Sequence, residues 1–412
     1  MSYHRRSDCR GCGNEALHPF LELGPTPLAN AFLRSAAEFA DEAAYPLDVV
    51  FCPRCSLVQI LDVVDPEVLF RDYIYVTGTS STIAAHNRAY AKTVAEVLEL
   101  RPGDRVVEVA SNDGSLLRCF ADLEMDVLGV EPASNIAAMA NESGISTVNR
   151  FFGHHEAQAL RKSHGPARAV IGNNVLAHVD DTLGFLRGFR ALIDDDGLAI
   201  LEVPYLGEFL ERLEYDTVYH EHLCYFSIRA LMHLCGEAGL RLVRADFVPV
   251  HGGSVRIYAA ADPEGIGHAA AILELAEGET AAGFGAPATY DRFAADVAAQ
   301  RTELREMLAS LVAEGRSLAA YGAPAKGNTL LNYCGVGTDW IPWTVDRNPL
   351  KVGLFTPGAH IPVLPVETLL ERQPDVVLIL AWNFAEEIME QQEAYRRAGG
   401  RFLIPVPRPR LV

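Results

Sequence analysis

From Arg105 onward, short apolar runs alternate with stretches of helical pattern. Four of these runs read RVVEVA, MDVLGVEP, ARAVIGNN and LAILEVP, and their length and β-branched content predict buried strands. Strands that alternate with helices in this way form a parallel sheet with crossover helices. Two further strand-like runs, LRLVRADFVPV and SVRIYAA, follow Pro204 and are expected to extend the sheet.

A long amphipathic stretch at residues 288–314 predicts a helix that joins two lobes. Beyond it, SLAAYGAPAKG, WTVDRNP, PDVVLILAWN and RFLIPV repeat the strand-then-helix order and predict a second doubly wound α/β lobe. A chain of 412 residues is too long for one hydrophobic core. We therefore expect three domains, at residues 1–80, 81–285 and 286–412.

Composition indicates an ordinary folded protein, with 49% hydrophobic and 22% charged residues. The 54 acidic and 35 basic residues give a net charge of -19, which disfavours nucleic acid as a partner. No apolar run reaches the length of a signal segment or a membrane span, so a cytoplasmic protein without a membrane partner is expected. Eight cysteines in such a chain are expected to be thiols or metal ligands rather than a disulfide framework.

Two CxxC pairs, separated by 39 residues, lie in the first domain at Cys9 and Cys12 and at Cys52 and Cys55. Paired CxxC turns supply four thiolates to a tetrahedral Zn²⁺. Because four thiolates leave no open coordination position, this metal is expected to be structural. The alternative is a pair of redox-active motifs or unrelated thiols.

A second motif, EVASNDG at residues 108–114, follows a predicted strand and precedes a predicted helix. A turn at this point places backbone N–H groups beside a ligand. Glu131 ends the next strand, where an acidic side chain can bind ribose hydroxyls. The GxGxxG fingerprint is missing, since Ala110 and Asn112 stand where glycines are expected, and this favours an adenosine ligand over NAD. A strand–turn–helix without a ligand is the alternative.

A third motif, YHEHLCYFS at residues 219–227, follows the predicted strand that ends at Pro204. Two histidines, a carboxylate and a tyrosine in four residues can supply a base, its orienting partner and a hydrogen-bond donor. The motif is not HExxH, because Cys224 stands in the place of the second histidine, and an HxH metal site would be short of ligands. The alternative is a polar loop with one buried histidine.

A fourth motif, GAPAKGNT at residues 322–329, superficially resembles a phosphate-binding P-loop. Asn328 stands in the place of the phosphate-binding lysine, so a P-loop nucleotidase is disfavoured. The stretch can still cradle a diphosphate with backbone N–H groups and Lys326. The alternative is a plain strand-to-helix turn.

Taken together, these motifs with YIYVTGTSS, NNVLAHV, HGGSVR and VDRNPLKVGLFTPGAHIP resemble the sugar C-methyltransferases of antibiotic deoxysugar pathways. The resemblance runs in order along almost the whole chain. It implies a small N-terminal zinc-binding domain, a central Rossmann-like domain that binds S-adenosyl-L-methionine, and a C-terminal doubly wound α/β domain that holds a nucleotide sugar. A monomer is expected.

The resemblance also assigns roles to residues of this sequence. It implies His222 as general base, with Tyr219, Glu221, Tyr73 and His178 beside it. The implied cofactor-binding residues are Glu108, Ala110, Ser111, Asn112, Gly114, Glu131, Pro132, Asn174, Tyr75 and Ser80. The candidate substrate-binding residues are Ser254, Arg256, Lys326, Asn328, Asn332, Arg347 and Lys351.

The implied reaction is methylation at C-3 of a dTDP-linked 4-keto deoxysugar. His222 would remove the C-3 proton, Glu221 would orient or polarise the imidazole, and Tyr219 or His178 would stabilise the enolate oxygen. One alternative is an O- or N-methyltransferase on the same scaffold, which needs no enolate stabiliser. Another is a zinc-containing binding protein without catalytic activity.

Overall fold

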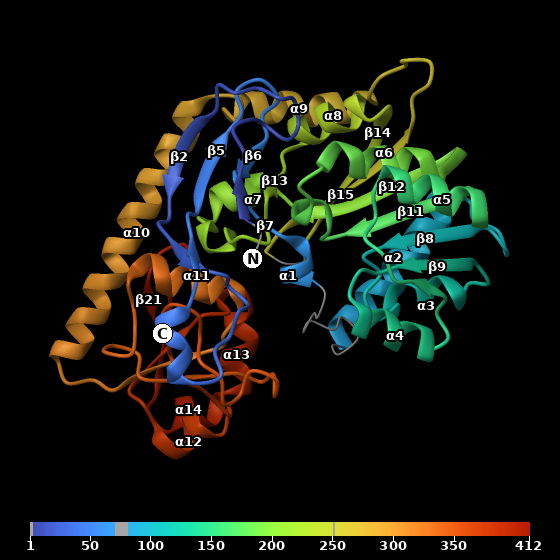
Figure 1. The fold of residues 1–412 in the computed structure, drawn as a ribbon. Helices are drawn as coiled ribbons and strands as arrows, with labels where there is room; N and C mark the ends of the chain where they lie inside the picture. The colour runs from blue at the N-terminus through green and yellow to red at the C-terminus, as the bar shows by residue number, and fades with distance from the viewer. Residues whose placement is uncertain (1–2, 71–80, 250–251) are drawn as a thin grey trace.

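The computed structural model describes residues 3–70, 81–249 and 252–412. Three lobes are visible in Figure 1, with the zinc-motif strands in blue at the upper left, above the C-terminal lobe and to the left of the central sheet. Tyr73, Tyr75 and Ser80, which the sequence places in the site, lie outside the described residues. No helix in the described ranges is both long and apolar enough to cross a membrane.

The central lobe is built on a seven-stranded sheet of order β10-β9-β8-β11-β12-β15-β14. Its strands are β8 (Arg105–Val109), β9 (Asp126–Val130), β10 (Thr147–Val148), β11 (Ala167–Asn173), β12 (Ile193–Pro204), β14 (Leu240–Val248) and β15 (Ser254–Ala261). The first five are parallel, whereas β15 runs antiparallel to both of its neighbours. The strand order reverses between β8 and β11, and ligands of open α/β sheets bind at the carboxyl ends of the strands at such a point.

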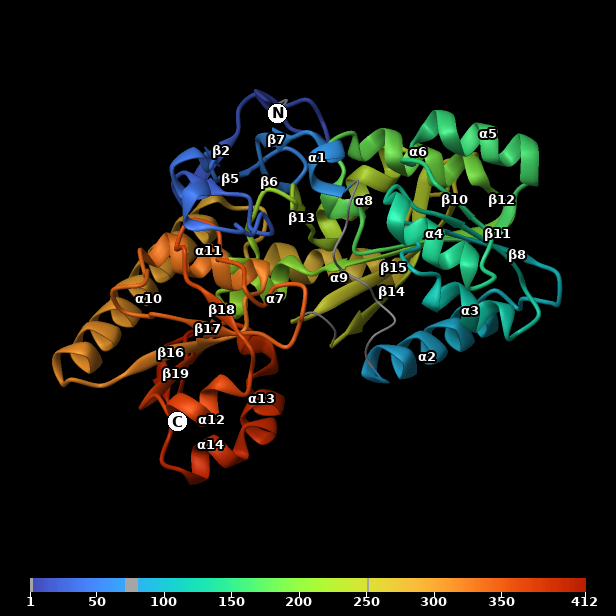
Figure 2. The same cartoon turned by 60° about the horizontal axis from the view of Figure 1, so that its bottom comes forward.

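Helices cover both faces of this sheet. The helices of this lobe are α2 (Ser81–Val97), α3 (Ser115–Ala121), α4 (Ser134–Glu142), α5 (His154–His164), α6 (Thr182–Leu192), α7 (Leu206–Glu211), α8 (Ile228–Glu237) and α9 (Ala270–Ala281). Figure 2 shows α5 and α6 on one face and α2 and α3 on the other. Successive side chains of β8 point to opposite faces of the sheet. Val106 therefore packs in the core with α2 and α3, whereas Val107 and Val109 pack in the core on the opposite face.

The N-terminal lobe contains a four-stranded antiparallel sheet of order β13-β6-β5-β2. Its strands are β2 (His18–Glu22), β5 (Asp48–Phe51), β6 (Val58–Ile60) and β13 (Cys224–Tyr225). Smaller elements complete the lobe: β1 (Tyr3–Arg5), β3 (Thr26–Pro27), β4 (Ala44–Tyr45), β7 (Asp62–Val64) and α1 (Pro66–Phe70). The edge strand β13 comes from the YHEHLCYFS segment, so the third motif and the zinc motif share one sheet.

The C-terminal lobe is the predicted second doubly wound unit, with strand order β18-β17-β16-β19-β20-β21. Its strands are β16 (Leu318–Tyr321), β17 (Thr344–Val345), β18 (Val363–Leu364), β19 (Val376–Ile379), β20 (Arg401–Ile404) and β21 (Arg410–Leu411), of which only β21 is antiparallel to its neighbour. Its helices are α11 (Ala325–Cys334), α12 (Thr368–Arg372), α13 (Ala385–Gln391) and α14 (Glu393–Arg397). The long helix α10 (Pro287–Ala313) confirms the predicted joining helix, since Val297 packs in the core of the first two lobes and Leu304 in that of the third.

Candidate active site

The two CxxC motifs meet as predicted and form one four-thiolate cluster. All four sulfur atoms lie within 4.8 Å of one another, with 3.4 Å between Cys9 and Cys55 and 3.5 Å between Cys12 and Cys52. A tetrahedral Zn²⁺ with Zn–S bonds of about 2.3 Å requires sulfur atoms at roughly this spacing. All eight cysteines are free thiols. The donor set therefore fits a structural zinc ion.

Both knuckles have the same backbone turn. The Gly13 N–H donates to the carbonyl of Cys9 at 2.8 Å, and the Ser56 N–H donates to that of Cys52 at 2.9 Å. Gly13 and Ser56 are both left-handed, with φ of 67° and 62°. The repeated turn presents each pair of thiols from the same side, as a shared metal requires.

The turn after β8 lies at the carboxyl edge of the central sheet. Ala110, Asn112 and Gly114 are all left-handed, with φ of 56°, 49° and 74°. The two residues that stand in the place of glycines thus adopt the backbone that glycine favours, although for a residue such as Ala110 this costs roughly 1–2 kcal/mol. Alternation of left- and right-handed residues turns successive N–H groups to one side, where they bind ligand oxygens.

Glu131, at the end of β9, is joined to this turn by hydrogen bonds. Its Oε2 accepts from the Asn112 N–H at 2.9 Å, and its Oε1 accepts from the Ala133 N–H at 2.8 Å. Burial raises the pKa of Glu131, and these two backbone hydrogen bonds oppose that shift. Glu131 is the residue for which the sequence analysis expects a contact with the ribose. Pro132, the other candidate at this point, follows it directly in the chain.

Two buried polar atoms beside this turn have no hydrogen-bond partner among the described residues. They are Oε2 of Glu108 and Oγ of Ser111. Burial raises the pKa of Glu108 well above its usual value, and the charges of Asp113 and Glu131 act in the same direction. Unmatched buried polar atoms are costly unless a ligand or water pairs with them, so the turn fits a polar cofactor.

Asn174 follows β11, next to β8 at the point where the strand order reverses. It is left-handed, with φ of 53°, and its N–H donates to the Glu202 carbonyl at 2.8 Å. The structure therefore brings Asn174 to the same edge of the sheet as the turn at residues 110–114. All predicted cofactor residues that are described meet at this edge.

Tyr219 and His222 form a hydrogen-bonded pair. The Tyr219 hydroxyl lies 2.8 Å from Nε2 of His222, and Nδ1 of His222 lies 2.9 Å from the Thr217 carbonyl. A carbonyl can only accept, so Nδ1 carries a proton, and when the ring is neutral this tautomer leaves the Nε2 lone pair to accept from the tyrosine. The Thr217 carbonyl thus orients the imidazole, which is a role that the sequence analysis expected of Glu221. A backbone carbonyl leaves no signal in the sequence.

His178 approaches the pair from the segment after β11. Its ring centroid lies 4.9 Å from that of His222, with an interplanar angle of 73°. Burial lowers the pKa of His178 to about 4, although backbone groups of Glu221 and Asn174 act against the shift. His178 is therefore neutral at physiological pH and suited to donate a hydrogen bond rather than to carry charge.

The zinc-binding lobe holds the loop that carries this pair. Asn30 Nδ2 donates to Glu221 Oε1 at 2.7 Å, and His220 Nε2 donates to the Pro46 carbonyl at 3.0 Å. The Ile60 N–H donates to the Leu223 carbonyl at 3.0 Å, directly before β13 joins β6. These contacts fix the loop from outside its own domain.

The predicted substrate residues on β15 are buried within the central sheet. Arg256 faces Glu202 in the strand register and donates to its Oε2 from Nε and Nη2 at 2.9 and 2.7 Å. The same guanidinium lies 3.6 Å from the centroid of the Tyr90 ring. Ser254 is also buried, at the start of β15. The guanidinium of Arg256 is thus engaged by Glu202 and by the Tyr90 ring.

Lys326 and Asn328 lie on α11 beside the loop that follows α7. Lys326 Nζ lies 3.8 Å from Glu214 Oε2 and 5.2 Å from the centroid of the Trp382 ring. Asn328 is buried and donates to the Ala29 carbonyl at 2.7 Å, while its Oδ1 has no hydrogen-bond partner among the described residues. Lys326 therefore faces the central lobe, and Asn328 contacts the zinc-binding lobe.

The other three C-terminal candidates are more dispersed. Lys351 Nζ donates to the Ala323 carbonyl at 2.8 Å, and Asn332 Nδ2 donates to the carbonyls of Asn328 and Pro357. The side chain of Arg347 is 67% exposed and reaches Gln391 on the surface. Arg347 is therefore separated from the buried contacts that Lys326 and Asn328 make.

Comparison with known proteins bears on the whole chain. This chain is 38% identical over 407 residues to the C-methyltransferase NovU of Streptomyces niveus, and the aligned residues cover 98% of this chain and 96% of that protein. The chain belongs to the C-methyltransferase family. Family profiles match in the same order as the lobes: a zinc-binding domain at residues 9–70, a methyltransferase domain at 83–245 and a C-methyltransferase C-terminal domain at 249–407.

Solved structures that are similar to this C-methyltransferase cover about half of its chain. The magnesium protoporphyrin IX methyltransferase of Synechocystis PCC 6803, with bound SAM, is 16% identical with a TM-score of 0.36, covering 48% of this chain and 98% of that one. The PH0226 protein of Pyrococcus horikoshii is 13% identical with a TM-score of 0.37, covering 48% and 96%. The family profiles and the relative establish an S-adenosylmethionine-dependent methyltransferase with a zinc-binding domain.

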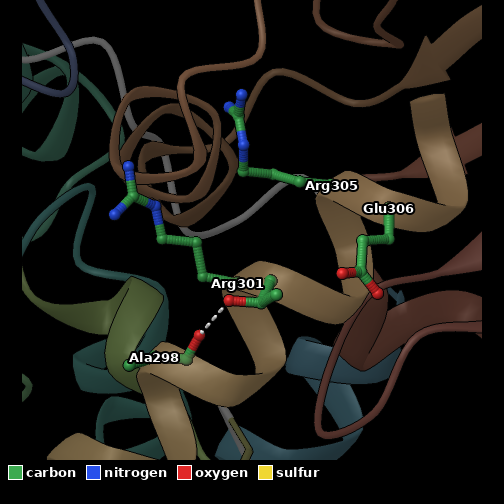
Figure 3. A pocket seen from close by; sticks show the side chains of 5 residues that line it. Ala298, Arg301, Arg305 and Glu306 are labelled. Carbon is green, nitrogen blue, oxygen red and sulfur yellow. Dashed lines mark hydrogen bonds between the residues drawn. The ribbon is translucent and has the colours of Figure 1, made fainter.

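A shallow hollow on α10 is separate from the active site of this C-methyltransferase. Figure 3 shows Arg301 and Arg305 on one side of it, with Glu306 on the other. The arginine side chains lie over aromatic rings, Arg301 over Tyr333 and Arg305 over Trp340. None of the predicted site residues lines the hollow.

Proposed function

We propose that this enzyme methylates C-3 of a dTDP-linked 4-keto deoxysugar, in deoxysugar and antibiotic biosynthesis. The observation that carries the proposal is the arrangement of Thr217, His222 and Tyr219, with contacts of 2.9 and 2.8 Å. It offers a neutral imidazole with a defined acceptor nitrogen and a hydroxyl donor beside it. Those are the groups that proton removal next to a ketone requires.

S-adenosylmethionine supplies the methyl group from its sulfonium when it is bound. When the sugar binds, the ketone oxygen accepts the Tyr219 hydrogen bond and the Nε2 lone pair of His222 is released. Nε2 then takes the proton from C-3, and the electron pair of that C–H bond passes to the enolate. Tyr219 and the neutral His178 stabilise the enolate oxygen.

The carbon nucleophile at C-3 would form the new C–C bond with the methyl group that bound S-adenosylmethionine supplies, and the electron pair of the S–CH₃ bond would stay on sulfur. Alignment of the two reacting carbons needs both ligands to be held firmly. We propose the residues at the edge of β8 and β11 for the cofactor, with Tyr75 and Ser80. Tyr73 is proposed beside the sugar.

Lys326 and Asn328 are the groups we favour for the nucleotide part of the substrate. They lie at the start of α11, close to the carboxyl edge of the C-terminal sheet, where doubly wound folds bind ligands. Asn332 is their neighbour on the same helix. Remote binding at this point holds the sugar for the reaction at His222.

We further propose a monomer with domain boundaries at residues 80/81 and 285/286. A reducing compartment such as the cytoplasm suits a four-thiolate metal site and free cysteines.

The test is a turnover assay with dTDP-4-keto sugars and their 4-hydroxy counterparts. Transfer to the 4-keto sugars alone, with a new C–CH₃ group at C-3 in the product NMR spectrum, is expected. An O–CH₃ or N–CH₃ product, or equal turnover of the 4-hydroxy sugars, would replace the proposal by an O- or N-methyltransferase. Absence of S-adenosylmethionine binding in calorimetry would favour the other alternative, a zinc-containing binding protein without catalytic activity.

A further inference from the structure

Ala29 and Asn30 of the zinc-binding lobe contact both other lobes. The Ala29 carbonyl accepts from Asn328 Nδ2 on α11 at 2.7 Å. The neighbouring Asn30 donates through Nδ2 to Glu221 Oε1 of the catalytic loop, also at 2.7 Å. Two consecutive residues thus join the C-terminal lobe to the loop that holds His222.

The carboxylate that Asn30 contacts is almost completely enclosed. Glu221 is 5% exposed, and Asn30 is its one side-chain hydrogen-bond donor in the described part of the chain. Burial raises the pKa of Glu221 to about 7, and the hydrogen bond from Asn30 opposes the shift. Without that donor the carboxyl group would be protonated over more of the neutral range.

The titratable groups around Glu221 do not replace this donor. His220 precedes it and donates from Nε2 to the Pro46 carbonyl, and burial lowers its pKa. His222 follows it and is occupied by Thr217 and Tyr219. His178 contacts the backbone of Glu221, and its lowered pKa keeps it neutral.

We propose that Asn30 is a positioning residue for methyl transfer, which holds in its ionised form the carboxylate of Glu221, the residue that directly precedes His222. The inference rests on the proposed function. An anion one residue from His222 favours the imidazolium that forms when Nε2 takes the substrate proton. The zinc-binding lobe therefore contributes a side chain to the electrostatics of the site as well as a support for its loop.

Two shape-matched substitutions test this role. Asn30→Leu removes the donor without adding charge, and Asn30→Asp keeps the shape while replacing the donor by an acceptor. The matched control is Glu42→Gln, which weakens a different contact between the zinc-binding and C-terminal lobes, at 2.8 Å between Glu42 Oε2 and His360 Nε2. The rate kcat/KM is measured against pH for each full-length protein.

Both Asn30 variants are expected to move the acid limb of the profile upward by about one pH unit, so that the rate falls roughly tenfold near neutral pH and recovers at alkaline pH. Asn30→Asp should move it at least as far as Asn30→Leu, and Glu42→Gln should leave it in place. A loss that is equal at every pH in both Asn30 variants would overturn the proposal and reduce Asn30 to a docking contact.

A second measurement separates this inference from the proposed function. The ¹³C carboxyl resonance of Glu221, assigned by its loss in Glu221→Gln, is titrated without substrate in wild-type protein and in both variants. A higher pKa in the variants supports the role of Asn30 even if no 4-keto sugar is methylated, which would refute the proposed function alone. An unchanged titration refutes the role of Asn30, whatever the substrate is.

Discussion

Arg10 Nε lies 2.9 Å from Oδ1 of Asp180, and this ion pair joins the first CxxC knuckle to the segment that carries His178. Arg10 stands between the two cysteines of the first knuckle, and its side chain is fully buried. It also donates from Nη1 to Gln59 at 3.1 Å and to the Ile60 carbonyl. Asp180 follows His178 by two residues, so the position of the knuckle affects the position of that histidine.

Zinc removal should therefore lower both stability and turnover. Metal analysis of chelator-free protein is expected to find about one zinc per chain. Treatment with a strong chelator should lower the melting temperature and abolish methyl transfer, because the knuckles lose their shared support. Added Zn²⁺ should restore both. Protein that contains no zinc when freshly purified would contradict the assignment of Cys9, Cys12, Cys52 and Cys55.

Replacement of the proposed base should remove catalysis and leave binding intact. His222→Asn is expected to lower kcat by roughly 10²–10⁴-fold, because a general base acts in the transition state. Calorimetry should show nearly unchanged affinity for S-adenosylmethionine and for the sugar nucleotide. Deuterium exchange at C-3, measured by NMR with a non-transferring cofactor analogue, should be lost in this variant.

Tyr219→Phe is the control for this experiment, since it removes the hydroxyl but leaves the imidazole on the Thr217 carbonyl. It should be impaired less than His222→Asn. If His222→Asn instead keeps near wild-type turnover while Tyr219→Phe loses it, the base is a tyrosinate or His178.

Glu131→Ala should weaken S-adenosylmethionine binding by roughly 1–3 kcal/mol. The substitution removes a proposed pair of ribose contacts and also the acceptor for the N–H groups of Asn112 and Ala133. Isothermal titration should show little change for the sugar nucleotide. Glu142→Ala, an exposed position on α4, is the control. Equal cofactor affinity in all three proteins would make Glu131 a purely structural residue.

Most strands of the two α/β lobes could be predicted from the sequence because each is a local apolar run, whereas β10, β18 and β21, of two residues each, are too short to give such a signal. The four-thiolate cluster could be predicted too, since CxxC spacing encodes half of the site in four residues. The pairing of β13 with β6 could not, because the register of Cys224 on Gln59 joins residues far apart in the chain and each strand is only two or three residues long.

Arg256 shows why single residues are harder to assign than elements. The sequence shows a basic residue but not its partner, and the register of β12 with β15 sets Glu202 directly opposite Arg256. Thr217 was missed for a different reason, since its functional atom is a carbonyl that every residue possesses. Ala110 was judged by its side chain, whereas the fold holds its backbone in the glycine region.

Burial of Glu221 gives the protein a pH-dependent stability. Folding raises the pKa of this group from 4.5 to about 7, so the folded chain binds the proton more tightly than the unfolded chain does. The resulting stabilisation is fully present below about pH 4.5 and is lost as the pH rises through about 7. Glu214, with its pKa raised to about 7 by burial, contributes in the same direction.

Glu221→Gln should therefore stabilise the protein at alkaline pH while impairing methyl transfer. Glutamine keeps an oxygen that accepts from Asn30 but carries no charge to bury, so the free energy of unfolding at about pH 8 should rise by roughly 1–3 kcal/mol, with no gain near pH 4. Melting temperatures at the two pH values provide the measurement, and Glu211→Gln, exposed on α7, is the control. A variant no more stable than wild type at pH 8 would mean that the ionised carboxylate is solvated and that the burial seen here does not penalise its charge. A gain in stability together with a loss of turnover would show that the buried charge of Glu221 lowers the stability of the fold but is needed for the reaction.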